Sequence, residues 1–312
     1  MTTGSHSALV YTGPGEFVTA VAGFIREGLS AGERAWVIAA PPMLEALQAD
    51  LGQDAGDVDF TDAGSAYRRQ ATAARVMIDY LSGHRGGRCR VVAEQDLSRR
   101  GRAEIDDYLR TEAAANSVFG RYPVSILCPY DAGALPEDVL TGCLQTHPQL
   151  LTDHGLEPNA EFIDSGAYIT TRLAVTEPPL DADSFACLRE VDLAAARPFV
   201  RARAVLAGLD GDTTGKLVQA VTEVLTNALK HGKPPRRMYV YTEGGVLVCH
   251  VHDSGAGLRN HLATYLPPGP GTGPGRGLWV ARQLCDSVEI ATDATGTHVR
   301  LLTALPDGTT GA

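Results

Sequence analysis

Short, continuously apolar runs alternate with longer amphipathic segments over the first 145 residues. Because strands that are apolar throughout are typical of a sheet covered on both faces, the pattern predicts a parallel sheet between two layers of helices. The predicted strands span residues 8–11, 35–40, 58–60, 89–93 and 124–128. The predicted helices span residues 16–28, 42–51, 66–81, 103–114 and 136–143.

A different pattern begins after Pro178 and Pro179, which mark the best candidate for a linker. Helices are predicted at 188–206, with an interruption at Pro198, and at 213–231. Predicted strands follow at 238–242, 246–253, 288–291 and 297–302, with a hairpin turn at Gly244-Gly245 between the first two. We therefore expect two domains of the α/β class, at 1–172 and 183–308, joined by a linker at 173–182.

The chain of 312 residues has a formal net charge of −10 and no long basic run, which argues against direct nucleic-acid binding. Its six cysteines form no CxxC pair, as in proteins whose thiols stay reduced. Neither a signal-peptide pattern nor an apolar stretch of membrane-spanning length is evident. We expect a cytoplasmic protein without membrane association, and a homodimer stays an open alternative.

The helix predicted at 213–231 carries an unusual polar face. Glu223, Asn227 and either Lys230 or His231 are spaced by i, i+4 and i+7 or i+8, so they share one side of the helix. A solvated surface accounts for this face equally well when the helix is considered alone. The segments that follow it favour a binding site.

The apolar run 246–251 leads directly into Asp253-Ser-Gly255-Ala-Gly257. A carboxylate at the end of a buried strand is costly without a partner, and the exocyclic amine of adenine is one such partner. Gly255 and Gly257 allow the backbone to approach a ligand closely. An ordinary turn is the alternative, because turns also favour Asp and Gly.

The segment 265–277 contains nine Gly or Pro residues among thirteen. It ends in Gly273-Pro-Gly275-Arg276-Gly277 and leads into a predicted helix. Since backbone N–H groups at a helix start attract phosphate, the segment is a candidate phosphate loop, with a flexible surface loop as the alternative. Thr297 opens the last strand and can add a hydroxyl to the same site.

These four elements, in this order, resemble the GHKL ATPases, which include DNA gyrase, histidine kinases and the anti-sigma factor serine kinases. The segment 223–232 is similar to their N box, 253–257 to their first glycine box, and Gly275-Arg276-Gly277-Leu278 to their second. The resemblance implies a two-layer α/β sandwich that holds ATP between helices and sheet. It also implies that Asn227 binds Mg²⁺, that Asp253 binds adenine, that 265–277 is a lid, and that Glu223 is the general base.

Within that family the chain looks most similar to the anti-sigma factor serine kinases. Histidine kinases carry a helix pair with a phospho-accepting histidine, whereas His147 precedes a proline and His154 lies in a glycine-flanked loop. The resemblance implies a sigma factor and an anti-anti-sigma (STAS-type) protein as partners, with transfer of phosphate to a serine of the latter. The proline-rich lid departs from the family pattern. Alternatives are an ATP-binding module without transfer, a histidine kinase, and a small-molecule enzyme in the N-terminal half.

The N-terminal half resembles the MEDS sensory domains in residues 6–11, 27–34, 127–131 and 146–148. That resemblance implies a degenerate RecA-like fold that senses a ligand. The candidate sensory pocket lies at or beyond predicted strand ends, where open α/β sheets bind ligands, and comprises His6, Tyr11, Glu94, Tyr130, Asp131 and His147. Satisfaction of turns and caps is an equal alternative. Gly13-Pro14-Gly15 lacks the rest of a phosphate-loop motif and is interpreted as a turn.

His250 and His252 share one face of the strand at 246–253, while Asp253 faces the other way. An HxH pair can bind a metal, but no third ligand is evident. A solvent-facing or partner-facing surface is therefore favoured.

Overall fold

The computed structural model describes residues 4–67, 70–83, 87–171, 175–187, 189–258, 260–265 and 276–306. The chain divides into two compact units, Met1–Tyr168 and Ile169–Ala312. The predicted linker at 173–182 falls within the second unit. No helix in the described ranges is both long and apolar enough to cross a membrane.

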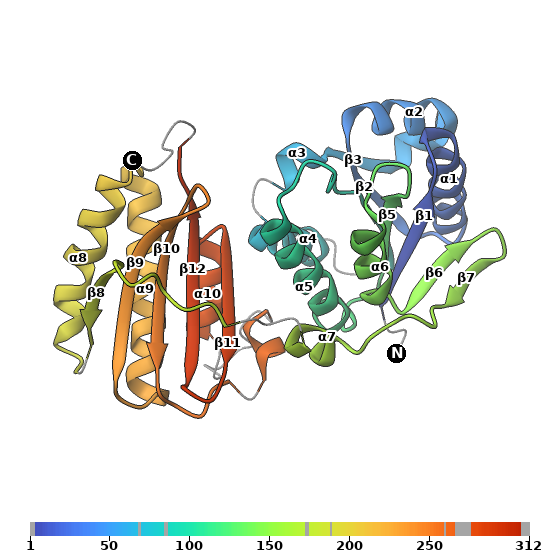
Figure 1. The fold of residues 1–312 in the computed structure, drawn as a ribbon. Coiled ribbons are helices and arrows are strands. Elements are labelled where there is room, and N and C mark those ends of the chain that lie inside the picture. The colour runs from blue at the N-terminus through green and yellow to red at the C-terminus, as the bar shows by residue number, and fades with distance from the viewer. Residues whose placement is uncertain are drawn as a thin grey trace. The chain divides into compact units, whose positions relative to one another are not determined.

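The first unit is built around a seven-stranded sheet with the order β3-β2-β4-β5-β1-β6-β7 (Figure 1). All neighbouring strands are parallel except β6 and β7, which confirms the predicted parallel sheet. The β6–β7 hairpin lies where the apolar pattern predicts no element. The strands span β1 Ser5–Tyr11, β2 Arg34–Ala39, β3 Val58–Asp62, β4 Cys89–Ala93, β5 Val124–Asp131, β6 Gln149–Thr152 and β7 Gly155–Pro158.

Helices cover both faces of this sheet, as expected for a RecA-like domain. α1 and α2 pack on one face through Phe17, Ile25 and Leu47, which have no exposed surface. α5 contacts β1 on the opposite face, beside α4 and α6. The helices span α1 Pro14–Ser30, α2 Pro41–Leu51, η1 Gly52–Asp57, α3 Ala63–Ala66, α4 Gln70–Gly83, α5 Arg102–Phe119, α6 Glu137–Gln145 and, beyond β7, α7 Ser165–Thr171.

The prediction of one helix over 66–81 is wrong at its N-terminal end. The short helix α3 begins directly after Asp62, whose carboxylate accepts hydrogen bonds from the backbone N–H groups of Gly64 and Ser65. Tyr67 then leaves the helical region, with φ −110° and ψ 38°, and α4 starts at Gln70. Because the Asp62 carboxylate caps this segment, a helical turn begins at Ala63, before the start that the apolar spacing predicts.

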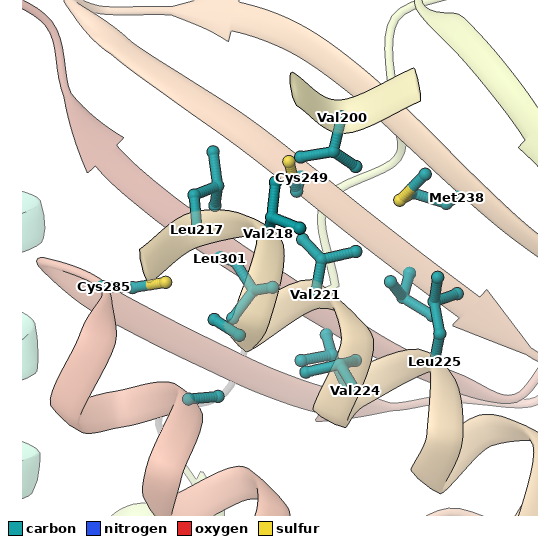
Figure 2. Packing of buried hydrophobic residues seen from close by; sticks show 14 of the residues in the cluster. Val200, Leu217, Val218, Val221, Val224, Leu225, Met238, Cys249, Cys285 and Leu301 are labelled. Atoms are coloured by element: carbon teal, nitrogen blue, oxygen red, sulfur yellow. The ribbon is translucent and has the colours of Figure 1, made fainter. Parts of the chain in front are cut away.

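The second unit is a two-layer α/β sandwich, which confirms the predicted fold. Its antiparallel sheet has the order β11-β12-β10-β9-β8, and helices cover one face. Val221, Leu225, Cys249 and Leu301 are buried between the layers (Figure 2). The elements span β8 Asp183–Ala186, α8 Asp192–Leu206, α9 Gly211–His231, β9 Arg236–Glu243, β10 Val246–Asp253, η2 His261–Thr264, α10 Arg276–Leu284, β11 Ser287–Thr292 and β12 Thr297–Ala304.

Two details of this unit differ from the predicted elements. β8 has no counterpart in the prediction, because a four-residue edge strand that is mostly exposed carries almost no apolar pattern. α8 continues through Pro198, where an interruption is predicted, although a proline in the middle of a helix removes one backbone hydrogen bond. The hairpin turn is confirmed, because Gly244 and Gly245 both have positive φ, at 55° and 80°.

Candidate functional site

Helix α9 positions the polar side chains predicted for catalysis. Asp210 caps its first turn, because its carboxylate accepts a hydrogen bond from the N–H of Thr213 at 2.8 Å. The apolar stripe of the helix faces the sheet. Glu223 and Asn227 are half-buried on the side next to that stripe, one turn apart.

Helix α10 begins beside these two side chains. A Cβ at Gly277 would lie 2.9 Å from Nδ2 of Asn227 and 3.0 Å from Oε2 of Glu223, so a side chain at this position does not fit. The N–H groups in the first turn of a helix have no partner within the helix and attract anions. The carboxylate, the amide and the start of α10 therefore form one polar corner.

Asp253 ends β10 inside the unit and is only 7% exposed. Its Oδ1 accepts a hydrogen bond from the N–H of Gly255 at 2.8 Å. A Cβ at Gly232 would collide with this carboxylate, and one at Gly255 would lie 2.6 Å from Oδ1. Among the described residues, no cationic side chain pairs with Asp253, so its charge is available to a ligand.

A cavity of about 380 Å³ lies between α9, α10 and the sheet, and Asp253 lines it. Its volume and its apolar surface with a few polar groups are typical of sites for small organic ligands. The apolar lining comes from Val224, Ala228, Val251, Leu258, Leu278, Ile290 and Val299. The polar and glycine lining comes from Asn227, His231, Gly232, Asp253, Gly255, Gly257 and Thr297.

The structure brings most residues of the predicted nucleotide site together. Those on the cavity wall are Asn227, His231, Asp253, Gly255, Gly257, Leu278 and Thr297, and Glu223 and Gly277 adjoin Asn227. Lys230 and Arg276 are exposed, and neither is on that wall. Gly273 and Gly275, with most of the predicted lid, lie outside the described residues.

The expectation of a solvent-facing His250 is wrong. This side chain has no exposed surface, and its Nε2 lies 3.1 Å from Nδ1 of His298 on β12. Residues 175–182 cross this face of the sheet (Figure 1). Glu177 in this segment lies near His298. Burial, together with the charges of His298, Arg300 and His252, lowers the pKa of His250 to about 3.

The candidate sensory residues of the first unit form two groups. Tyr11, Glu94, Tyr130 and Asp131 line a cavity of about 220 Å³ at the carboxyl ends of the strands, the position at which open α/β sheets bind ligands. Glu94 accepts hydrogen bonds there from the N–H of Ala40 at 2.8 Å and from the hydroxyl of Tyr11 at 3.3 Å. Burial raises the pKa of Glu94.

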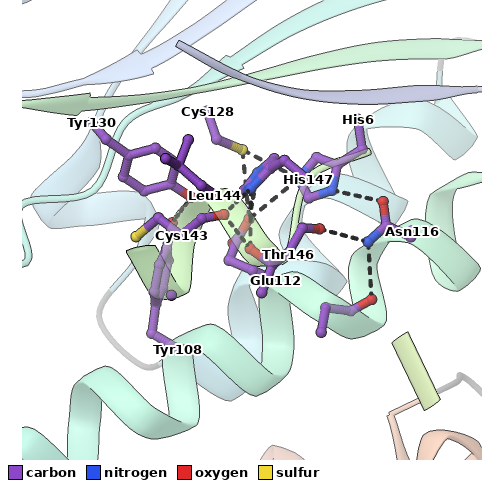
Figure 3. A network of polar contacts seen from close by, with 12 residues as sticks. His6, Tyr108, Glu112, Asn116, Cys128, Tyr130, Cys143, Leu144, Thr146 and His147 are labelled. Atoms are coloured by element: carbon purple, nitrogen blue, oxygen red, sulfur yellow. Dashed lines mark hydrogen bonds and ion pairs between the residues drawn. The ribbon is translucent and has the colours of Figure 1, made fainter. Parts of the chain in front are cut away.

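His6 and His147 form the other group, in a buried cluster with Glu112 of α5 and Cys128 of β5 (Figure 3). Tyr130 adjoins both groups, because its ring contacts His147 while it also lines the cavity at the strand ends. Sequence analysis missed Glu112 and Cys128. The available signal was an acidic residue within the apolar face of the predicted helix 103–114.

The turn after β1 has the structure expected from the sequence. Gly13 has a φ of 84°, and α1 begins at Pro14. The N–H of Thr12 donates to the carboxylate of Glu16 at 2.6 Å, so the chain's own carboxylate occupies the start of this helix. This arrangement fits the interpretation of Gly13-Pro14-Gly15 as a turn.

Comparisons with known proteins give two family matches. Residues 5–148 match the model of the MEDS domain (MEthanogen/methylotroph, DcmR Sensory domain), and residues 187–303 match that of the histidine kinase-like ATPase domain. No curated protein matches the chain.

Two solved structures are similar to parts of the chain. The RsbU and RsbW domains of Rv1364c from Mycobacterium tuberculosis share 20% identity with a TM-score of 0.30, over 39% of this chain and 32% of that one. This chain thus spans about a third of the mycobacterial one. The histidine kinase domain of the E. coli osmosensor EnvZ shares 14% identity with a TM-score of 0.26, over 44% of this chain and 97% of that one. By the two family models, the chain carries an N-terminal MEDS domain followed by a histidine kinase-like ATPase domain.

Proposed function

We propose that the second unit binds Mg·ATP, transfers the γ-phosphate to a serine of an anti-anti-sigma (STAS-type) partner, and sequesters a sigma factor. The observation that carries this proposal is the convergence of Asp253, Asn227 and Glu223 on one apolar cavity and its polar corner. The first unit modulates this activity through a ligand in the cavity that Glu94 lines.

The adenine end of the nucleotide fits the cavity around Asp253. A buried carboxylate without a cationic partner is costly, and an exocyclic amine donates the hydrogen bond that offsets this cost. Val251, Ile290 and Val299 supply apolar contact on the wall of the same cavity. Thr297 adds a hydroxyl on the same wall.

The phosphate end fits the corner formed by Glu223, Asn227 and the start of α10. The amide oxygen of Asn227 is a ligand that Mg²⁺ accepts, and the first turn of α10 favours anions. ATP with its Mg²⁺ supplies the phosphoryl group. Glu223 takes the proton of the attacking serine hydroxyl, whose oxygen bonds the γ-phosphorus while the bond to the β,γ-bridging oxygen breaks and ADP leaves.

Serine is favoured over an internal histidine as the acceptor. His147 has no exposed surface and lies after the end of α6. His154 lies in the turn between β6 and β7. A phospho-accepting histidine of the expected kind would stand exposed on a helix, and neither residue does.

Nucleotide binding is tested with the full chain and Mg·ATP by isothermal titration calorimetry. We expect Asp253→Asn to weaken ATP binding at least tenfold. The new side-chain NH₂ group donates a hydrogen bond at the point where the exocyclic amine of adenine also donates. Asp286→Asn is the matched control, because Asp286 follows α10 away from the cavity lining. Unchanged ATP affinity in Asp253→Asn would refute the proposed adenine site.

Transfer is tested with γ-labelled Mg·ATP, a candidate STAS-type protein and a sigma factor. We expect label on a partner serine, and a loss of about 10²–10⁴-fold in Glu223→Gln with ATP affinity retained. Label on a histidine of this chain would show a histidine kinase instead. Sigma binding without any label would show an ATP-binding module that does not transfer phosphate.

A further inference from the structure

The buried cluster in the first unit contains four side chains that can bind a metal ion. His6, Glu112, Cys128 and His147 each direct one donor atom to a common point, and these atoms lie within 4.8 Å of one another. All four residues are buried. They come from β1, α5, β5 and the connection after α6, so only the fold brings them together.

Four of the six distances between these donor atoms match the edges of a tetrahedron around a transition metal. Oε2 of Glu112 lies 3.2 Å from Nε2 of His6, 3.5 Å from Nε2 of His147 and 3.5 Å from Sγ of Cys128. Sγ of Cys128 lies 3.4 Å from Nε2 of His6. Ligand atoms at zinc bond lengths in a regular tetrahedron are separated by roughly 3.3–3.6 Å.

Neighbouring groups fix both histidines with Nε2 turned toward this point. Nδ1 of His147 lies 2.7 Å from the carbonyl oxygen of Cys143, which can only accept, so Nδ1 carries the proton. Nδ1 of His6 lies 3.1 Å from Oδ1 of Asn116. The Asn116 amide is oriented by its Nδ2, which donates to the carbonyl oxygen of Thr146 at 2.9 Å. Such hydrogen bonds to the outer nitrogen are typical of metal-binding histidines.

The inner atoms do not satisfy one another without a positive charge among them. Two imidazole lone pairs and a carboxylate are all acceptors, and the Cys128 thiol can donate only one hydrogen bond. Nε2 of His147 is buried and makes no hydrogen bond with the described residues. If His6 carries a second proton, it pairs with Glu112, but Nε2 of His147 still lacks a hydrogen-bond partner among the described residues. A divalent cation satisfies all four atoms.

We propose that His6, Glu112, Cys128 and His147 form a closed, four-coordinate site for a divalent transition metal of the zinc class. Two imidazoles, one thiolate and one carboxylate are ligands that zinc accepts in tetrahedral sites, whereas Mg²⁺ and Ca²⁺ prefer oxygen alone. Binding releases the thiol proton of Cys128 to solvent. The two anionic ligands then balance the charge of the cation, so the buried site is neutral.

The site is structural rather than catalytic, because the four side chains leave no position for a substrate. A metal at this site also affects the cavity at the strand ends, because Tyr130 connects the two. That side chain contacts the ring of His147, and its hydroxyl lies 2.7 Å from the hydroxyl of Tyr108. The metal therefore fixes one wall of the cavity in which the ligand of the first unit is proposed to bind.

Metal content and cobalt spectra of the full chain test this site. We expect about one zinc per chain by elemental analysis after purification without a metal-affinity step. Refilling the chelated chain with Co²⁺ should produce the strong visible bands of four-coordinate cobalt and a thiolate-to-cobalt band in the near ultraviolet. This experiment uses the native chain, so it does not depend on whether a variant folds.

Variants assign the ligands. Cys128→Ser should lose the thiolate-to-cobalt band, and His147→Gln should weaken metal binding at least 100-fold. Cys143→Ser and Glu94→Gln are matched controls, since they alter a nearby buried thiol and a buried carboxyl outside the cluster and should retain the metal. Asn116→Ala should weaken binding by about 10–100-fold, because it frees the ring of His6.

Thermal unfolding supplies an independent measurement. In a Trp279→Phe background, in which Trp36 is the remaining tryptophan, zinc should raise the unfolding temperature of the first unit by roughly 5 °C or more relative to the chelated chain. A native chain without stoichiometric metal, without cobalt bands and without this shift would overturn the proposal. The cluster would then be a metal-free ion pair between His6 and Glu112.

Discussion

The cavity around Asp253 and the cluster around Glu112 both hold a carboxylate among buried residues, but they satisfy it differently. Asp253 is surrounded by glycines and apolar side chains, and its one hydrogen bond within the described residues comes from the N–H of Gly255. Glu112 is surrounded by two histidines and a cysteine. The first site is open to a ligand that brings its own donors, whereas the second is filled by side chains.

This difference explains which site the sequence reveals. Backbone-built sites need glycine at fixed spacing next to one polar residue, and that combination is visible in a contiguous stretch such as 253–257. Side-chain-built sites need no local pattern. The four residues of the closed cluster are separated by up to 141 positions, from His6 to His147, and each is unremarkable in its own segment.

The largest expected effect is on the glycine-built site. Gly232→Ala places a Cβ against the Asp253 carboxylate, so we expect nucleotide affinity to fall at least 100-fold, about 2.7 kcal/mol. Gly215→Ala is the control, because a Cβ there meets nothing within 4 Å and alanine favours the helix. Titration calorimetry measures both variants. Equal affinities would show that nucleotide binding at Asp253 does not need the space left by the missing side chain of Gly232, which would contradict the description of this site as glycine-built.

An intermediate effect is expected from pH, because His250 is buried and no carboxylate of the described residues contributes to its pKa. Its pKa is lowered to about 3 in the folded protein, whereas the unfolded chain binds the proton near 6.5. Between these values the unfolded state holds more protons, so stability is complete above about pH 6.5 and falls as the pH is lowered. The loss at pH 5 is about 2 kcal/mol.

Urea unfolding at pH 7 and pH 5 measures this loss. In a Trp36→Phe background, Trp279 is the remaining tryptophan and reports on the second unit. His250→Gln should reduce the difference between the two pH values. If His250→Gln and the parent lose equal stability at pH 5, other groups are responsible for the pH dependence.

The smallest expected effect separates two adjacent residues of α9. Both side chains are exposed, but His231 lines the cavity and Lys230 does not, and sequence spacing alone could not choose between them. We expect His231→Ala to weaken ATP binding several-fold and Lys230→Ala to change it less than about twofold, because Lys230 is not on the cavity wall and an exposed charge contributes little. Parallel calorimetric titrations compare the two. The opposite order would place the phosphates on the outer side of the helix.

Much of the fold could be predicted because the strands of the first unit are continuously apolar and the helices between them are amphipathic. What could not be predicted depends on other forces. Asp62 begins α3 by capping, and β8 is held by pairing with β9 rather than by an apolar pattern. Hydrogen bonds determine both α3 and β8, and such bonds are not visible in the spacing of apolar residues.

The candidate nucleotide residues could be found from local patterns. Asp253 and Thr297 lie in or next to glycine motifs, and Glu223 and Asn227 share one face of a helix. The environment of His250 could not, because its neighbour His298 lies on another strand, 48 positions along the chain. Alternation along a strand shows which residues share a face. It does not show what covers that face.

The segment at 175–182 determines where the second unit can be separated from the rest of the chain. A fragment beginning at residue 183 would keep all five strands and helices α8 to α10, yet it would lack the peptide that lies across the outer face near His298. That fragment would also lack the Glu177 carboxylate that lies near His298. A fragment beginning at Ile169 keeps that peptide, because the boundary between the two compact units falls before it.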